Sequence, residues 1–207
     1  MTDSKEHLQT ITEIRSMMER SSRFISLSGL SGIFSGIFAL CGAYAAYLKL
    51  NSLDGMYRLL DSNAFTDVVI YLLADASIVL LASLTVGIIL TVRNSKKKGI
   101  KIWDATSKRL FINLLIPLIS GGIFCLVLLY HGLVGLVAPS TLIFYGLALI
   151  NASKYTLNDI RYLGVCEIIL GLIAAMFFGY GLFFWAAGFG VLHIIYGSMM
   201  YFKYERN

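Results

Sequence analysis

One acidic side chain stands inside a segment that is otherwise apolar. The stretch from Leu163 to Met176 reads LGVCEIILGLIAAM, and Glu167 is its only charged residue. A charged side chain near the centre of a membrane helix costs about 2.5–3.5 kcal/mol on insertion scales, so such a residue faces the helix bundle or water and finds a partner. Glu167 is therefore the first candidate for a functional group.

His193 is expected to lie at a matching depth in the membrane. Glu167 precedes Gly181, where we expect a tight turn, by fourteen residues, and His193 follows that turn by twelve residues. At ~1.5 Å per residue the two depths differ by about 3 Å, which is within reach of a hydrogen bond between antiparallel neighbours. A histidine and a carboxylate in contact could exchange a proton near neutral pH.

Asp75 is the third candidate, because it is the only other carboxylate well inside an apolar segment. It lies about 12 Å from the outer end of its helix, so Asp75, His193 and Glu167 would descend from the outer toward the inner half of the membrane.

Three interpretations are open. In the first, Glu167 holds two helices together or its side chain extends toward cytoplasmic water. In the second, the three residues form a path for protons or a solute. In the third, Glu167 and His193 act as a switch.

Six apolar segments are long enough to position these residues in a membrane. Of the 207 residues, 57% are hydrophobic and 14% charged, well below the roughly 25% charged residues of soluble domains. About 20 apolar residues in a helix cross a ~30 Å hydrocarbon core, and the alternation of a membrane β-barrel is absent. The predicted spans are Phe24–Leu48, Asp67–Val92, Leu110–Tyr130, Gly132–Asn151, Tyr162–Tyr180 and Leu182–Phe202.

The distribution of basic residues predicts both termini in the cytoplasm. Of the 17 Lys and Arg residues, only Lys49 and Arg58 fall in segments on the opposite side from the termini. Basic residues favour the cytoplasmic side, so we expect an integral protein of the plasma (inner) membrane. The loop Arg93–Trp103 is explained by this topology and by anionic lipid at the inner surface, and we expect no nucleic-acid partner.

Two parts of the chain are distinguished. Residues 1–23 are predicted to form an amphipathic cytoplasmic helix, and residues 24–207 a single six-helix transmembrane domain. The apolar residues of the first part recur at steps of three and four: Leu8, Ile11, Ile14 and Met18. Its charges are balanced, unlike those of a helix that lies on a lipid surface, so it is expected to contact the protein's own loops or a partner protein.

Small residues form one face of the first span. Ser28, Gly32 and Gly36 recur every four residues. Such faces let helix backbones approach closely in lipid. The face is expected either to pack within the monomer or to form a homodimer.

The sequence carries no enzyme or cofactor signature. Cys41, Cys125 and Cys166 all lie in predicted spans without metal-site spacing, so they are expected to be apolar fillers, with no metal or other cofactor. GxSxG, P-loop, HExxH and CxxC motifs are absent. We therefore do not expect an enzyme.

An internal repeat indicates three helical hairpins of one kind. GIFCLVLLYHGL at 122–133 aligns with GLIAAMFFGYGL at 171–182, and FYG at 144–146 aligns with IYG at 195–197. The last hairpin, LGVCEIILGLIAAMFFGYGLFFWAAGFGVLHIIYG at 163–197, resembles the short repeat of HdeD-like membrane proteins. Both have a glycine, two residues, Glu-Ile-Ile-Leu-Gly, a glycine turn and a second apolar helix that ends in glycine. The proline that the family usually has near the turn is absent. The resemblance implies six spans built from hairpins and a link with acid resistance.

Two functions follow as expectations. The resemblance implies an accessory, stress-related membrane protein that acts by assembly with itself or with a partner protein. The alternative is a small proton- or solute-linked transporter or channel that uses Asp75, His193 and Glu167. A broad water-filled cavity lined by all three residues would favour transport, whereas a closed and dry bundle would favour assembly.

Overall fold

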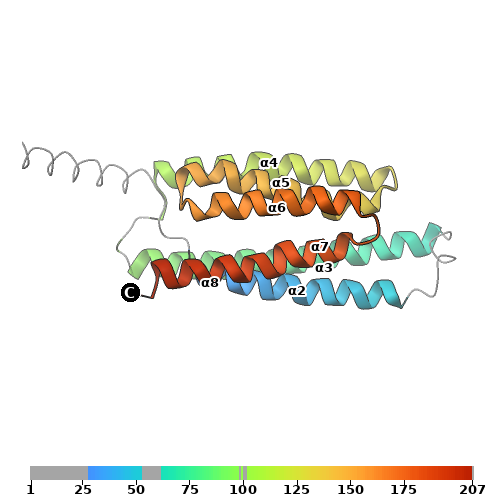
Figure 1. Cartoon of the computed structure of the whole chain (residues 1–207), viewed down its shortest axis with the longest axis horizontal. Coiled ribbons are helices and arrows are strands. Elements are labelled where there is room, and N and C mark those ends of the chain that lie inside the picture. Colours follow the sequence, from blue (N-terminus) through green and yellow to red (C-terminus); the bar gives the residue numbers. More distant parts are fainter. Residues whose placement is uncertain (1–27, 53–61, 98, 100–101, 207) are drawn as a thin grey trace, which may run out of the picture.

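Every regular element in the described part of the chain is a helix. The computed structural model describes residues 28–52, 62–97, 99 and 102–206 (Figure 1). The long helices are α2 (Gly29–Asn51), α3 (Ser62–Lys97), α4 (Ala105–Tyr130), α5 (Val137–Ala152) and α6 (Asp159–Met176). A last, composite helix consists of α7 (Gly181–Trp185), the π-helical segment η4 (Ala186–Leu192) and α8 (His193–Tyr204). Short 3₁₀ turns, η2 (Val134–Leu136) and η3 (Ser153–Tyr155), flank α5. The predicted helix at residues 1–23 lies outside the described residues.

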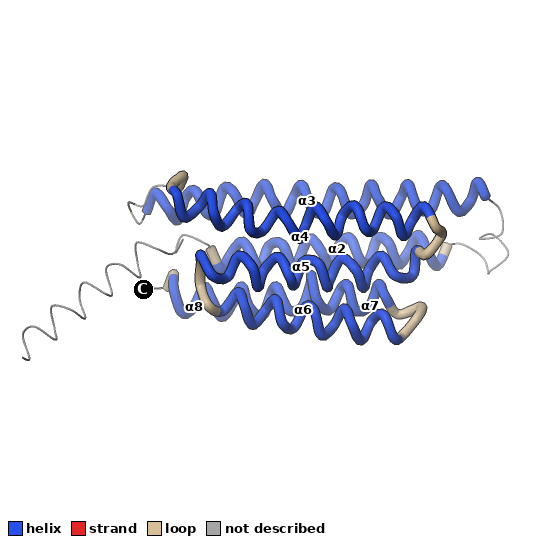
Figure 2. Tube along the Cα trace, turned by 90° about the horizontal axis from the view of Figure 1, so that it is seen from above, coloured by secondary structure: helices blue, strands red, loops and turns tan. Residues whose placement is uncertain are grey.

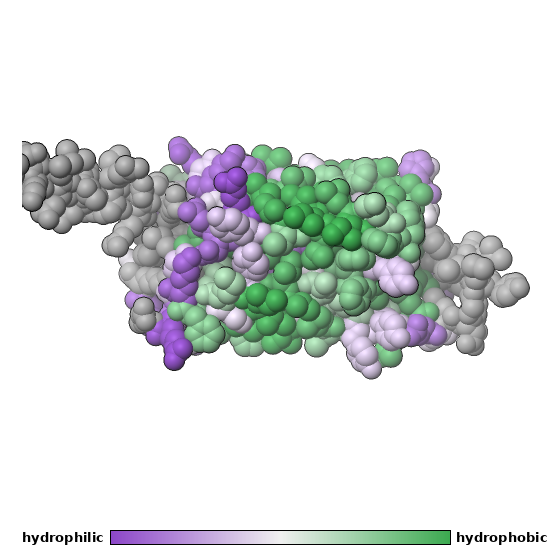
Figure 3. Space-filling view, viewed as in Figure 1, coloured by the Kyte–Doolittle hydropathy of each residue, from purple (hydrophilic) through white to green (hydrophobic). Residues whose placement is uncertain are grey.

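The described helices confirm the prediction of an all-α protein with several membrane spans. Five helical stretches are long and apolar enough to cross a membrane: Gly29–Asn51, Thr66–Lys97, Ala105–Tyr130, Val134–Tyr155 and Gly181–Tyr204. On the face shown in Figure 3, apolar residues cover the middle of the molecule and hydrophilic residues gather toward its two ends.

The fifth predicted span, Tyr162–Tyr180, corresponds to α6, which is not among those five stretches. It has 18 residues and contains three charged ones, Asp159, Arg161 and Glu167. It runs beside α5 along its length (Figures 1 and 2). Its position in the membrane stays a prediction.

The helices form two layers of three. One layer contains α4, α5 and α6 with α5 in the middle, and the other contains α3, α2 and α8 with α2 in the middle (Figure 1). The last two predicted spans do follow one another through a tight turn, where Gly179 adopts a φ of 91° that favours glycine. They do not pair closely along their length, because α6 packs mainly on α5 while α8 packs on α2.

Glycine contacts explain why these pairs form. A Cβ atom on Gly146 of α5 would lie 2.5 Å from the Gly164 carbonyl oxygen of α6. A Cβ atom on Gly197 of α8 would lie 2.7 Å from the Gly29 carbonyl oxygen of α2. Without side chains at these points the backbones come into contact, which gives the dispersion energy that drives helix association in lipid.

Polar contacts fasten the end of α8 to both layers. The Glu205 carboxylate accepts hydrogen bonds from the Ser28 hydroxyl, at 3.1 Å, and from the backbone amide of Gly29 at the start of α2. The Asp159 carboxylate, at the start of α6, accepts from the Tyr204 hydroxyl at 2.7 Å and from Lys203 Nζ at 3.0 Å. Partial burial acts to raise the pKa of Asp159, but these hydrogen bonds outweigh it and hold that pKa below its usual value.

Candidate functional site

Glu167 and His193 meet at the boundary between the two layers. The Glu167 side chain on α6 is fully buried, with 0% exposure, and His193, the first residue of α8, is 7% exposed. His193 Nδ1 lies 3.4 Å from Glu167 Oε1. The structure thus brings together the two residues whose depths matched in the sequence.

A tyrosine from α5 completes the group. His193 Nε2 lies 2.8 Å from the Tyr145 hydroxyl, and His193 Nδ1 lies 3.0 Å from the Gly188 carbonyl oxygen. Because a carbonyl oxygen only accepts, Nδ1 carries the proton that is donated to Gly188. In the neutral imidazole Nε2 then accepts from Tyr145. We call Glu167, His193 and Tyr145 the polar cluster.

Gly188 makes room for the Glu167 carboxyl group. A Cβ atom on Gly188 would lie 2.5 Å from Glu167 Oε2 and 2.5 Å from Leu142 Cδ2. Within the described residues neither carboxyl oxygen has a hydrogen-bond partner. The approach to His193 is therefore an electrostatic contact, since the Nδ1 proton is directed at Gly188. His193 lies at contact distance from the carboxyl group, and Gly188 and Leu142 lie beside it.

This arrangement can hold a proton in two ways without changing its net charge. A protonated carboxyl beside a neutral imidazole and a carboxylate beside an imidazolium are both neutral overall. A further proton would give the cluster a net positive charge in an apolar enclosure, which is energetically costly. The cluster can thus hold one proton on either residue, and it lies where three helices meet.

Aromatic rings surround the histidine. The Phe189 ring centroid lies 4.9 Å from that of Tyr145, 5.8 Å from that of His193 and 5.0 Å from that of Trp185. The Phe189 ring offers no hydrogen-bonding atom. A column of rings, and not a chain of polar groups, therefore extends from the cluster toward Trp185.

Asp75 is not part of the polar cluster. It lies on α3 and lines a cavity of about 300 Å³ whose wall includes Trp185 but neither Glu167 nor His193. The predicted line through Asp75, His193 and Glu167 is therefore divided. The two inner residues contact each other, and the outer one faces a separate space.

The small-residue face of the first span packs within the monomer. A Cβ atom on Gly32 would lie 3.1 Å from Gly197 Cα, and one on Gly36 would lie 2.6 Å from the Gly190 carbonyl oxygen. Ser28 binds Glu205 as described above. A dimer through the same face would require the last helix to leave it, so a homodimer remains a prediction that needs another surface.

Tyr145 and Gly188 were missed by the reasoning from sequence. Tyr145 lies 48 residues before His193, and a tyrosine in an apolar span is usually a packing residue. A signal was present in the FYG motif that aligns with IYG in the repeat, and in the glycine-rich AAGFGVL that precedes an intramembrane histidine. π-helical segments often accompany functional sites, but their position depends on packing.

The cysteines do not contribute to the site. Cys41, Cys125 and Cys166 are all free thiols. In the described part of the chain, three or more His, Cys, Asp or Glu residues nowhere gather in a way that could hold a metal ion.

Comparisons with known proteins add no relative: protein-family models, curated proteins and solved structures all gave no match to this chain.

Proposed function

We propose that this multi-span helical membrane protein is an accessory, stress-related protein that acts by assembly with itself or with another protein, and that the polar cluster is its proton-sensitive element. The observation that supports this proposal is the enclosure of Glu167. Its carboxyl group is fully buried at the boundary of the two layers, against His193 of α8. A closed setting of this kind favours a role in conformation over a role in conduction.

The position of the cluster suggests how protons would act. The titratable groups that face Glu167 are His193 from one layer and Tyr145 from its own layer. An added proton would leave unbalanced charge at the boundary, and the cost would fall on the contact between the layers. A change in that contact would alter the surface that the bundle presents to other proteins, which links proton binding to assembly.

Two features of the sequence agree with this proposal. The resemblance of Leu163–Gly197 to HdeD-like proteins implies a role in acid resistance. The segments between the helices are short, so an effect on a partner would pass through the bundle. The proposed orientation has both termini in the cytoplasm, and labelling of a Lys97→Cys variant by an impermeant thiol reagent in intact cells would contradict it.

Transport is less well supported by the geometry. A proton or solute path through Asp75, His193 and Glu167 needs a cavity that joins all three, whereas the cavity at Asp75 includes neither of the others. Proton flux into liposomes that is present with the wild-type protein and lost in Glu167→Gln would reverse the preference.

The decisive experiment is a double-mutant cycle measured against pH. Glu167→Gln, His193→Gln and the double variant are compared with wild type by thermal unfolding in detergent between about pH 5 and 8, the range in which histidine ordinarily titrates. Because the two residues act as one unit, their effects should be non-additive by about 1–2 kcal/mol, and Glu167→Gln should change the slope of stability against pH.

Cross-linking at the two ends of this pH range provides the readout of assembly. We expect the oligomeric fraction of the wild type to change with pH and that of Glu167→Gln to stay constant. Asp67→Asn is the control, because Asp67 is an exposed carboxylate outside the cluster and outside the bonds that join α6 to α8. Wild-type and Glu167→Gln curves that coincide in both assays would reduce the carboxyl group to a packing role.

A further inference from the structure

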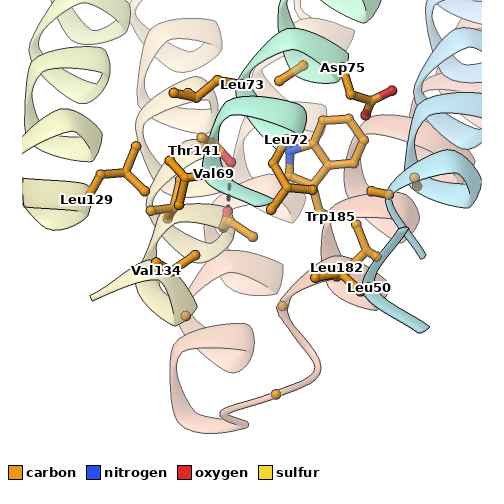
Figure 4. A pocket seen from close by; sticks show the side chains of 18 residues that line it. Leu50, Val69, Leu72, Leu73, Asp75, Leu129, Val134, Thr141, Leu182 and Trp185 are labelled. Carbon is orange, nitrogen blue, oxygen red and sulfur yellow. Dashed lines mark hydrogen bonds between the residues drawn. The ribbon is translucent and has the colours of Figure 1, made fainter. Parts of the chain in front are cut away.

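The cavity at Asp75 is a second site, separate from the polar cluster. It has a volume of about 300 Å³ and lies between the two layers, with walls from α2, α3, α4, α5 and α7 (Figure 4). Leu50 at the end of α2 and Gly179 in the turn between α6 and α7 belong to its wall. It therefore lies toward the end of the bundle that is opposite to the C-terminus (Figure 1). The distribution of Lys and Arg predicts that this end is on the outer side of the membrane.

The wall of the cavity combines one acid with an aromatic ring and an aliphatic surface. Among the described lining residues, Asp75 is the only ionisable one, and Thr141 and Trp185 are the only others with polar side chains. The Thr141 hydroxyl donates to the Ala138 carbonyl oxygen at 2.7 Å, as the dashed line in Figure 4 shows. The other described lining residues are Ala, Gly, Val and Leu.

The Asp75 carboxylate is available for a ligand. It lies against α2, where a Cβ atom on Gly42 would be 3.3 Å from Asp75 Oδ2. No hydrogen bond or ion pair joins Asp75 to any other residue in the described ranges, and none of the lining residues in those ranges is Lys, Arg or His. In Figure 4 the carboxylate and the Trp185 indole lie on one side of the pocket, and Leu129 and Val134 lie on the other.

We propose that this cavity binds a lipophilic monocation, an amine or a quaternary ammonium ion. An ionised carboxylate among apolar residues in a membrane protein is stabilised by an opposite charge, and the described residues of the cavity wall provide none. A cation bound at Asp75 supplies that charge, and the face of an indole is the best aromatic surface for a cation. The apolar part of the same molecule fills the aliphatic side of the cavity, whose volume is at the lower end of small-molecule sites. This inference does not depend on the function proposed for the polar cluster.

The test uses Trp185 as its own reporter. The chain has two tryptophans, and Trp103 is exposed outside the cavity. In the Trp103→Phe variant all tryptophan fluorescence therefore comes from Trp185. The purified protein in a neutral detergent is titrated with benzyltrimethylammonium and, in parallel, with neopentylbenzene, the uncharged molecule of the same shape. We expect a saturable change in Trp185 fluorescence with the cation, at about tenfold higher affinity than with the neutral molecule.

Three variants test whether binding depends on the Asp75 carboxylate, on any acidic side chain of the helix, or only on partition of the probes into detergent. Asp75→Asn should reduce the affinity for the cation about tenfold and leave that for the neutral probe unchanged. Asp67→Asn, which changes an exposed carboxylate on the same helix, should alter neither. Ala76→Phe, which fills the cavity from α3, should remove binding of both probes.

The result that would overturn the proposal is equal affinity for the two probes, or an undiminished preference for the cation in Asp75→Asn. Thermal unfolding shows which variants are folded. If Asp75→Asn does not fold, the ratio of the two affinities in the Trp103→Phe protein and the loss of both in Ala76→Phe decide the question.

Discussion

Two carboxylates lie inside apolar helices of this protein, and their surroundings differ in every respect that matters for chemistry. Glu167 is fully enclosed and contacts His193 at 3.4 Å. Asp75 borders a cavity and has no ionic or hydrogen-bonded partner among the described residues. An ionised acidic side chain in a membrane helix needs an opposite charge close to it. For Glu167 the neighbouring His193 provides it, and for Asp75 we infer that a ligand provides it.

The packing of the two helices explains this difference. The helix of Glu167, α6, packs closely on α5 and faces the glycine-rich segment η4 across the layer boundary. The helix of Asp75, α3, packs mainly on α2, and none of its most apolar 18-residue window is buried within the protein. Both helices are at the edge of a layer, but α6 also contacts α7, η4 and α8 across the layer boundary, whereas α3 packs on α2 and leaves space beside it.

The largest expected effect comes from filling the enclosure of Glu167. Gly188→Leu should lower the free energy of unfolding by about 3 kcal/mol, because the new side chain would overlap the carboxyl group and Leu142. Gly122→Leu on α4 is the matched control, since nothing lies within 4 Å of a Cβ atom there. Chemical denaturation in detergent measures both. Equal stability of the two variants would mean that the enclosure is loose.

A second prediction compares the two carboxylates directly. Glu167→Leu should lower the stability by about 1–2 kcal/mol, because it removes the charge partner of buried His193. Asp75→Leu should leave the stability unchanged or raise it by up to about 1 kcal/mol, because an uncompensated acid is replaced by an apolar residue. Thermal unfolding of the ligand-free protein at pH 7 provides the comparison. Changes of the same sign and size would remove the distinction between the two sites.

The smallest expected effect concerns Asp159, a third carboxylate, which lies outside the apolar segments. Its pKa in the folded protein is lower than in the unfolded chain, so its contribution to stability is fully present above the usual aspartate pKa of 3.8 and is lost as the pH falls through the folded value. Asp159→Asn should therefore lower the melting temperature slightly at pH 7 and remove part of the acid sensitivity below about pH 4. A variant as acid-sensitive as the wild type would show that Lys203 and Tyr204 contribute nothing there.

The candidate site was partly predictable, and the helical rise explains which part. The depths of Glu167 and His193 depend only on counting residues from a turn, because every residue of a helix adds the same ~1.5 Å. Tyr145 approaches from α5, a helix that is not adjacent in sequence to either the turn or His193. The contact of Tyr145 with His193 and that of Gly188 with the Glu167 carboxyl group depend on how the helices are placed around one another. Counting residues along the chain gives no information on that placement.

By itself, the sequence determined the class of this protein and the approximate limits of its helices. Long apolar runs have few alternatives in lipid, because every backbone amide and carbonyl must be paired within the segment. Only the tertiary structure decided that the last two predicted spans belong to different layers, that the Ser28–Gly36 face packs on α8, and that Asp75 is separated from His193. These outcomes depend on which backbones approach each other most closely, at Gly146 with Gly164 and at Gly197 with Gly29. In lipid, helix pairing follows close packing more than hydrophobicity, so a hydropathy pattern shows where the helices are but not which neighbours they choose.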